Sequence, residues 1–331
     1  MRSLVSAVAA GLVLSACARN TPPQAPSPAR NVPAANAAAA GDSAGPGGRG
    51  GAGAEPRPQP YNRVVTSGAQ TREGMFKVHR IGPKLLFEIP KDQLNKDILL
   101  VSEIAQTTLG VGYGGAAVGN RVLNFERRNN YMYLRGKSFA IRADTTTPEW
   151  QAVQAANVRP IIAVFNIESY GADSAAVIDV TRLFTQPPNE LGVSSRIPGS
   201  VDAARSWVEN AVPFPDNVNV TSTLTINRTG AAGRGEGAPA AGGGTTASTV
   251  VMHWSFHRLP DVPMMPRLCD DRVGYFSVRY TDFTDRDGKV HDRCLITRYR
   301  LEKKDPSAAI SDPVKPIVYY IDPATPTKWV P

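Results

Sequence analysis

Short apolar runs of alternating pattern, separated by residues that favour tight turns, constrain the fold of this chain more than any other feature. Two such pairs lie at 75–81 with 84–89 and at 121–128 with 131–135. Gly82-Pro83 joins the first pair and Asn129-Asn130 joins the second. Alternation puts successive side chains on opposite faces of a strand, and Gly or Asn supplies the left-handed backbone that a two-residue hairpin needs. The pattern predicts antiparallel hairpins.

The rest of the ordered sequence extends this β pattern. Further strands are predicted at 97–104, 160–169, 176–180, 217–226 and 249–256, with a last hairpin at 273–283 and 289–300 around Asp287-Gly288. Helices are expected to be few and short, one at 147–156 after a Thr-Pro-Glu start and one at 201–211. The predicted fold class is therefore mostly β, an α+β protein with hairpin-rich antiparallel sheets.

The first 17 residues are typical of an export signal. Met1-Arg2 is a positive start, and residues 4–14 are apolar but too few to span a bilayer. Leu-Ser-Ala-Cys at 14–17 resembles the bacterial lipobox, in which the residue corresponding to Cys17 is lipidated. The resemblance implies an exported, membrane-anchored lipoprotein of the cell envelope. An ordinary signal peptide with an incidental cysteine is the alternative.

Two segments are too poor in large apolar residues to form a core. Residues 18–60 are rich in Pro, Ala and Gly and are expected to be a disordered tether, and residues 230–247 are expected to be a disordered loop between two strands. The β-rich domain is expected at 61–310, in one unit or two subdomains.

The net charge of +8 is modest for 331 residues, and the basic residues are scattered rather than clustered. A nucleic-acid partner would favour a dense basic stripe, so none is expected. The other cysteines, Cys269 and Cys294, flank the last predicted hairpin in an exported chain, which favours a disulfide over a zinc site.

His253 and His257 are spaced as in a helical zinc motif, but Trp254 stands where that motif needs glutamate. The surrounding apolar residues alternate, which predicts a strand, and on a strand residues four apart are separated by about 13 Å. No metal ligand is therefore predicted. His79 and His291 are isolated in the sequence and indicate no site.

Residues 110–115 fit the glycine pattern of dinucleotide sites, yet the next predicted element is a strand and not the required helix. The acids Asp282, Asp285 and Asp287 do not fit a calcium loop, because its twelfth position would be Cys294. Neighbouring Asp270 and Asp271 would point to opposite faces of an extended chain. No catalytic residue and no cofactor are predicted for this chain.

Four blocks follow one another along the chain, at 121–135, 177–184, 254–276 and 317–329. The second reads Val-Ile-Asp-Val-Thr-Arg-Leu-Phe, and the fourth begins Ile-Val-Tyr-Tyr-Ile-Asp-Pro. In this order they resemble the N-terminal accessory region, a domain of uncharacterised role, that precedes the catalytic domain of bacterial metzincin-like zinc-dependent metalloproteases. The resemblance covers about residues 61–331.

In that family the protease domain carries HExxH and a further histidine, whereas this chain contains no HExxH. The resemblance implies a non-catalytic accessory region, with residues 311–331 as the first strand of a truncated protease domain. Zinc is expected only in the missing catalytic domain, and the expected partners are that domain or a peptide, besides the membrane. A free-standing surface module that binds a peptide or glycan is the alternative, and an enzyme built on dispersed carboxylates is a third possibility.

Overall fold

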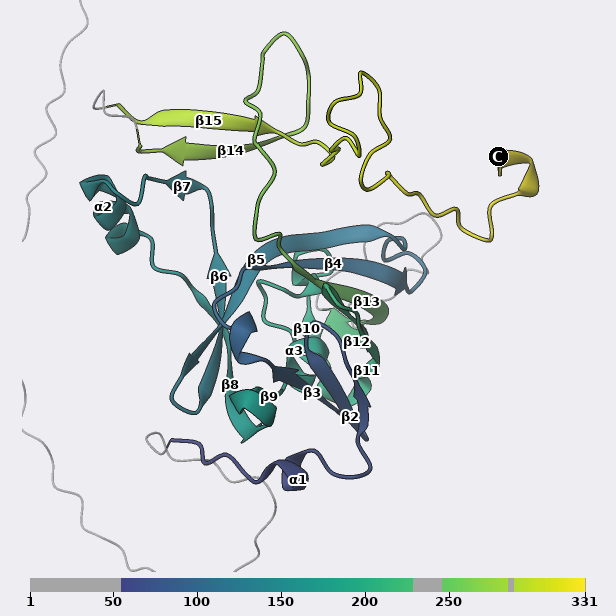
Figure 1. Ribbon diagram of the computed structural model, residues 1–331. Helices are drawn as coiled ribbons and strands as arrows, with labels where there is room; N and C mark the ends of the chain where they lie inside the picture. The colour runs from purple at the N-terminus through teal and green to yellow at the C-terminus, as the bar shows by residue number, and fades with distance from the viewer. Residues whose placement is uncertain (1–54, 229–245, 285–288, 331) are drawn as a thin grey trace, which may run out of the picture. The chain divides into compact units, whose positions relative to one another are not determined.

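The computed structural model describes residues 55–228, 246–284 and 289–330, and its mostly β architecture confirms the predicted fold class (Figure 1). Within these residues the strands form one sheet of twelve strands and one of three. In spatial order, the large sheet runs β1 (Gln70–Arg72), β2 (Lys77–Ile81), β3 (Lys84–Ile89), β9 (Ala176–Asp179), β8 (Ile161–Tyr170), β6 (Tyr131–Lys137), β5 (Ala116–Arg128), β4 (Ile98–Thr107), β13 (Thr246–Arg258), β12 (Asn217–Arg228) and β10 (Ser200–Val201), with β11 (Trp207–Pro213) also on β12.

The small sheet consists of β15 (His291–Ile296), β14 (Ser277–Asp282) and β7 (Ile141–Arg142). The helices are α1 (Tyr61–Val64), α2 (Pro148–Ala156) and α3 (Thr181–Thr185), with one-turn 3-10 helices at Lys91–Gln93, Ala172–Ser174, Val193–Ser195, Ala203–Arg205 and Thr327–Trp329. Among the helices of the described ranges, none combines the length and apolar character needed to cross a bilayer.

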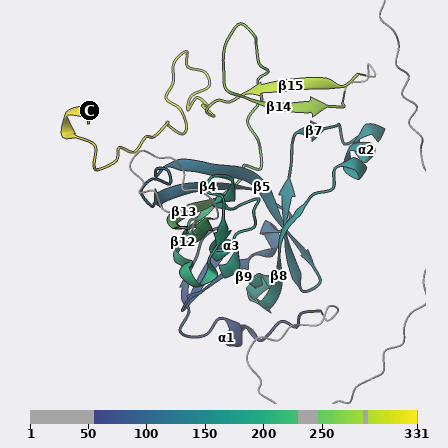
Figure 2. The ribbon, with the colours of Figure 1, turned by 180° about the vertical axis from the view of Figure 1, so that it is seen from behind.

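The large sheet curls around a core of aromatic side chains. The Phe87 ring lies 5.8 Å from that of Phe76, 6.0 Å from that of Phe184 and 6.2 Å from that of Phe256. Phe184 comes from α3, which packs against β3, β11 and β12 (Figure 1, Figure 2). Trp254 completes the cluster, 5.8 Å from Phe184 and 1% exposed. Most of the alternating runs thus bury one face in a shared core, whereas β3 is buried on both faces.

The predicted hairpins and the first helix are confirmed. Asn129 adopts a φ of 52° in the turn between β5 and β6, as its left-handed tolerance predicted. Strands β12 and β13 pair along their full length, and β14 pairs with β15. The turn at 287–288 and nearly all of the 230–247 loop lie outside the described residues. Cys17 and residues 1–54 lie outside them too.

The helix predicted at 201–211 is wrong, because β10, a 3-10 turn and β11 occupy this stretch. Val208 and Ala211 are both buried, and their spacing of three mimics one face of a helix. The spacing arises from a β-bulge between Val208 and Asn210, where an extra residue enters β11 opposite β12. Periodicity alone cannot separate a bulged strand from a short helix.

Both ends of the described chain differ from expectation. Residues 317–321, expected as a strand, belong to no ladder among the described residues, and the 3.1 Å bond of Tyr319 to Tyr299 joins two side-chain hydroxyls rather than backbones. Residues 55–60, expected at the end of the tether, are instead bonded to the large sheet. Gln59 N donates to Glu168 O at 2.7 Å, and Glu55 Oε1 accepts from Asn130 N at 3.0 Å.

Candidate functional site

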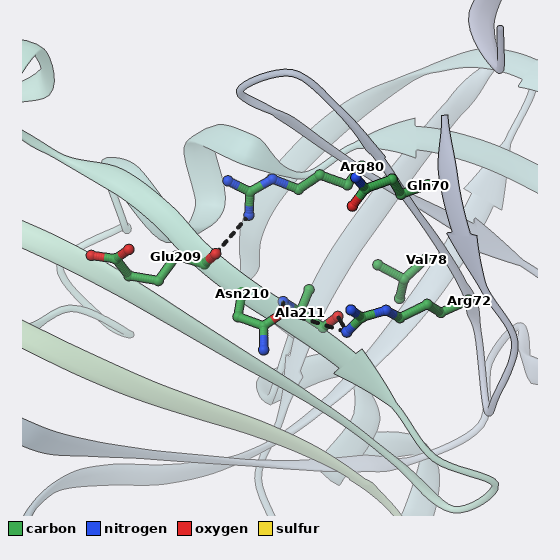
Figure 3. A pocket seen from close by; sticks show the side chains of 7 residues that line it. All are labelled: Gln70, Arg72, Val78, Arg80, Glu209, Asn210 and Ala211. Atoms are coloured by element: carbon green, nitrogen blue, oxygen red, sulfur yellow. Dashed lines mark hydrogen bonds between the residues drawn. The ribbon is translucent and has the colours of Figure 1, made fainter. Parts of the chain in front are cut away.

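The two ends of the curled sheet meet at a junction that we call the seam, with β1 and β2 on one side and β11 on the other. Arginine side chains, rather than a backbone ladder, bridge most of it (Figure 3). Arg80 donates from Nη2 to Val208 O at 2.6 Å and from Nη1 to Glu209 O at 3.2 Å. Arg72 donates from Nη1 to Ala211 O at 3.3 Å.

The local sequence explains why side chains are needed here. Among the described strands, β11 pairs only with β12, so its outer carbonyls require other donors. The bulge at Val208–Asn210 interrupts the regular strand geometry, and a guanidinium with several N–H donors can reach carbonyls that a flat neighbouring strand would miss. One direct backbone bond, from Met75 N to Phe214 O at 2.7 Å, pins the end of the seam.

A cavity of about 230 Å³ opens at the seam. Its lining residues are Gln70, Arg72, Val78, Arg80, Glu209, Asn210 and Ala211. In Figure 3 the Glu209 carboxylate points away from both arginines, and it accepts a 2.6 Å bond from Thr223 Oγ1. Neither Arg72 nor Arg80 has a carboxylate partner among the described residues, so donors and positive charge dominate this cavity.

A second polar feature, which we call the buried polar chain, lies nearby on β1–β3. His79 is fully buried, and its Nδ1 lies 2.8 Å from Thr71 Oγ1 while its Nε2 lies 3.0 Å from Glu88 Oε2. Tyr61 OH donates to the same Glu88 oxygen at 2.7 Å. Burial, the bond to Glu88 and the charge of Glu88 raise the pKa of Tyr61 to about 12. These contacts fasten α1 to the sheet.

The buried polar chain is tightly enclosed. A Cβ on Gly171 would meet Glu88 Oε1 at 2.4 Å, so a larger residue here would displace the Glu88 carboxylate. Neither cavity described here is lined by His79 or Glu88, and every member of the chain has a hydrogen-bond partner, which fits a structural anchor. Sequence reasoning missed it because His79 looked isolated. An acid inside the otherwise apolar run 84–89 was the available signal.

A second cavity, also about 230 Å³, lies between β4, β5 and the 189–195 loop. Arg121 Nε donates to Glu190 O at 2.6 Å across it. That guanidinium is already bound to the loop, so it is less available to a ligand than the arginines of the seam. The seam cavity is therefore the stronger candidate site.

The residues singled out in the sequence are dispersed over the structure. Cys269 and Cys294 form the predicted disulfide, with Cα atoms 5.3 Å apart. His253 and His257 lie on strand β13, as predicted, and burial and the proximity of His253 lower the pKa of His257. Within the described residues, no three or more His, Cys, Asp or Glu side chains gather to hold a metal ion.

The glycine run 110–115 connects β4 to β5, and a strand follows it, as predicted. Gly110 and Gly115 have φ values of 79° and 82°, which suits a turn rather than a helix start. Asp270 is bound by Arg272 at 2.6 Å, and the Arg272 bond lowers the pKa of this exposed carboxyl. Asp282 lies 3.8 Å from Arg293, while Asp285 and Asp287 lie outside the described residues.

The C-terminal arm, residues 259–284 and 289–330, differs from the sheet because none of its described residues is buried. It nevertheless carries most of the exposed large apolar side chains. Its strongly exposed members include Met265 (80%), Phe276 (91%), Ile310 (93%), Tyr319 (76%), Tyr320 (96%) and Trp329 (71%).

Comparison with known families finds two domains, and the boundary between them lies within the large sheet rather than between the sheet and the arm. Residues 115–304 match the family described as Domain of unknown function (DUF5117), and residues 58–107 match that described as Domain of unknown function (DUF5118). The first match covers more than half of the 331 residues, so the chain belongs to the DUF5117 family. No curated protein and no solved structure matches the chain. The two matched segments share one sheet, since β3 pairs with β9 and β4 with β13.

Proposed function

We propose that this chain is the non-catalytic accessory region of a zinc-dependent metallopeptidase-like envelope lipoprotein, and that its C-terminal arm packs on or regulates the protease domain. The single observation that carries the proposal is the arm itself, which is rich in large apolar side chains and has no buried residue among those described.

Large apolar side chains exposed to water raise the free energy of the arm until a partner surface covers them. Covering one large apolar side chain is worth about 1.5–3 kcal/mol, so an arm with many of them gains substantially from a partner surface. Phe276, Tyr320 and Trp329 are aromatic, the residue type that dominates stable interfaces. A folded domain with an apolar face is the partner that this composition fits, in agreement with the resemblance of blocks 254–276 and 317–329.

The docking test uses the purified full chain and a separately expressed metzincin-like protease domain from a member of the same protease family. Isothermal titration should give a saturable complex with a negative heat-capacity change, the signature of apolar burial. The double variant Phe276→Ser, Tyr320→Ser should weaken binding strongly. Leu109→Ser, Tyr113→Ser is the matched control, because both residues are exposed but lie in the β4–β5 connection.

Equal binding by the two double variants would count against docking through the arm. The non-catalytic part of the proposal has its own test, because the chain alone should release no product from a generic peptide substrate. Turnover that a chelator abolishes would overturn it. Mass spectrometry should find a lipidated N-terminal peptide beginning at Cys17, and a mature chain that keeps the residues before Cys17 would refute the lipoprotein anchor.

A second candidate function, a surface module that binds a peptide or glycan, is favoured by one specific observation. The seam places a cavity with two arginines beside the free edge of β1. The two functions are compatible, because the seam and the arm use different residues.

A further inference from the structure

The hydrogen bonds of Arg72 leave one edge of its guanidinium open. Its Nη1 donates to Ala211 O at 3.3 Å and is 3.4 Å from Asn210 Oδ1. Its Nε and Nη2 have no hydrogen-bond partner among the described residues. These two nitrogens present parallel N–H bonds on one side of the group, which is the arrangement that grips a carboxylate in a bidentate manner.

The other polar groups of the cavity supply donors as well. Asn210 uses its Oδ1 for the Ala211 amide at 2.9 Å, which leaves its Nδ2 protons for another acceptor. Arg80 is fixed by three carbonyls, those of Gly82, Val208 and Glu209, so it contributes its charge with little freedom to move. The cavity is thus positive, donor-rich and held in place before any ligand arrives.

We infer that the seam cavity binds a carboxylate group, gripped by Nε and Nη2 of Arg72 and flanked by the amides of Gln70 and Asn210. A carboxylate suits the site better than a phosphate. Only one guanidinium edge is open, which matches one negative charge and two acceptor oxygens, whereas a dianionic phosphate would keep oxygens without strong donors.

The edge of β1 points to the kind of molecule that carries this carboxylate. Strand β1 pairs with β2 on one side and with no strand on the other within the described residues. An extended peptide can therefore pair with its outer edge while a carboxylate enters the cavity. A small free dicarboxylic acid offers the same group without the backbone. The shared chemistry is the carboxylate, and the experiment separates the two sources.

The experiment uses the ¹⁵N-labelled full chain and follows the arginine Nε–Hε signals during titration. The probes are succinate, a short acetylated peptide with a free C-terminal carboxylate, the same peptide with an amidated end, and inorganic phosphate. The Arg72 signal should shift and saturate with the free peptide, with succinate, or with both. Tighter binding of the peptide identifies a peptide ligand, and equal or tighter binding of succinate identifies a small acid.

Variants link the binding to Arg72. Arg72→Gln should weaken binding about tenfold or more, because a charged hydrogen-bonding pair is lost. Arg72→Lys should weaken it similarly, since lysine keeps the charge but not the fork. Arg196→Gln, at an exposed arginine that does not line the seam cavity, is the matched control and should bind like the unchanged chain. Arg72 is exposed and donates to β11 through Nη1 alone, so both of its variants should fold and lower the unfolding midpoint less than Arg80→Met does.

Three results would overturn the inference. The first is equal affinity of the unchanged chain and both Arg72 variants. The second is equal binding of the free and amidated peptides combined with no response to succinate. The third is saturation by phosphate without any response to the carboxylates. None of these results bears on docking of the arm, so failure here and failure of the proposed function remain distinguishable.

Discussion

The curled sheet and the C-terminal arm of this protein are similarly rich in apolar residues, but the sheet buries many of them whereas the arm leaves its own exposed. Every buried side chain of the described residues lies between Met75 and Phe256, where twelve strands enclose an aromatic core. The arm carries Phe276, Ile310 and Tyr320 at more than nine-tenths exposure. The comparison teaches that apolar content does not make a core unless the topology brings the residues to one enclosed face.

The two regions are therefore stabilised by different interactions. The sheet is held by burial, which is worth about 25 cal/mol for each Å² of apolar surface removed from water. The arm is held by the Cys269–Cys294 disulfide, the β14–β15 hairpin and the pairing of β14 with β7. Variants in each region should show how much each kind of interaction contributes to stability, and the expected losses differ in size.

The largest effect is expected in the core. Trp254→Ala should destabilise the chain by about 3–5 kcal/mol, because it empties the centre of the aromatic cluster and leaves Ser222 Oγ, 2.9 Å from the indole nitrogen, without its partner. Trp207→Ala, at a half-exposed tryptophan of the same sheet, is the matched control. Urea unfolding measures both. Equal losses would show that the core does not dominate stability.

The next effect concerns the disulfide. The double variant Cys269→Ser, Cys294→Ser should lower the free energy of unfolding of the arm by about 2–4 kcal/mol and leave that of the large sheet unchanged. Hydrogen exchange should speed up in β14 and β15 while β12 and β13 stay protected. Faster exchange throughout the large sheet would mean that the two regions unfold as one, which would break the comparison.

An intermediate effect is expected at the seam. Arg80→Met keeps the apolar stem but removes the donors to Val208 and Glu209, and it should cost about 1–2 kcal/mol. Hydrogen exchange of β11 reports the local change, with Arg196→Met as the control. If β11 keeps its protection in Arg80→Met, the ladder with β12 alone suffices to hold it.

A smaller, pH-dependent effect is expected at Tyr61. Its pKa is raised from 10.0 to about 12, so the folded chain keeps the proton over a range in which the unfolded chain releases it. This contribution is fully present below pH 10 and is lost as the pH rises towards 12. The bond to Tyr319 also raises the pKa of Tyr299, so phenolate absorbance should show more than one late-titrating tyrosine. Tyr61→Phe should remove the part of the late step near pH 12, and an unchanged late step would assign all of it to other tyrosines.

The smallest effect on stability is expected in the arm. Phe276→Ser should change the unfolding free energy of the isolated chain by no more than about 0.5 kcal/mol, because the side chain is 91% exposed. Calorimetric unfolding checks this. A loss as large as that of Trp254→Ala would mean that the arm is already packed on the chain itself, and the contrast between the regions would disappear.

Local pattern predicted much of the fold correctly. Alternating apolar residues predicted the strands, Asn129 predicted its hairpin turn, and the cysteines flanking a hairpin predicted their bond. Each of these signals lies within a short stretch of chain. The exception was residues 201–211, where a bulge gave a strand the spacing of a helix.

Local sequence patterns did not predict the candidate sites. Arg72 and Arg80 meet β11 only because the sheet curls, across separations of more than a hundred residues. His79 and Glu88 become a buried pair only when β2 and β3 are covered. The seam arginines leave no motif, because their partners come from distant strands, and the buried pair left one local sign, the acid Glu88 inside an apolar run.

The sequence by itself determined which segments become strands, since strand patterning and turn chemistry act over a few residues. The tertiary structure alone decided which strands are neighbours, where the sheet closes and which apolar residues stay exposed. Those outcomes depend on contacts between distant segments, whose free energies are set by packing of the whole sheet and not by any local propensity.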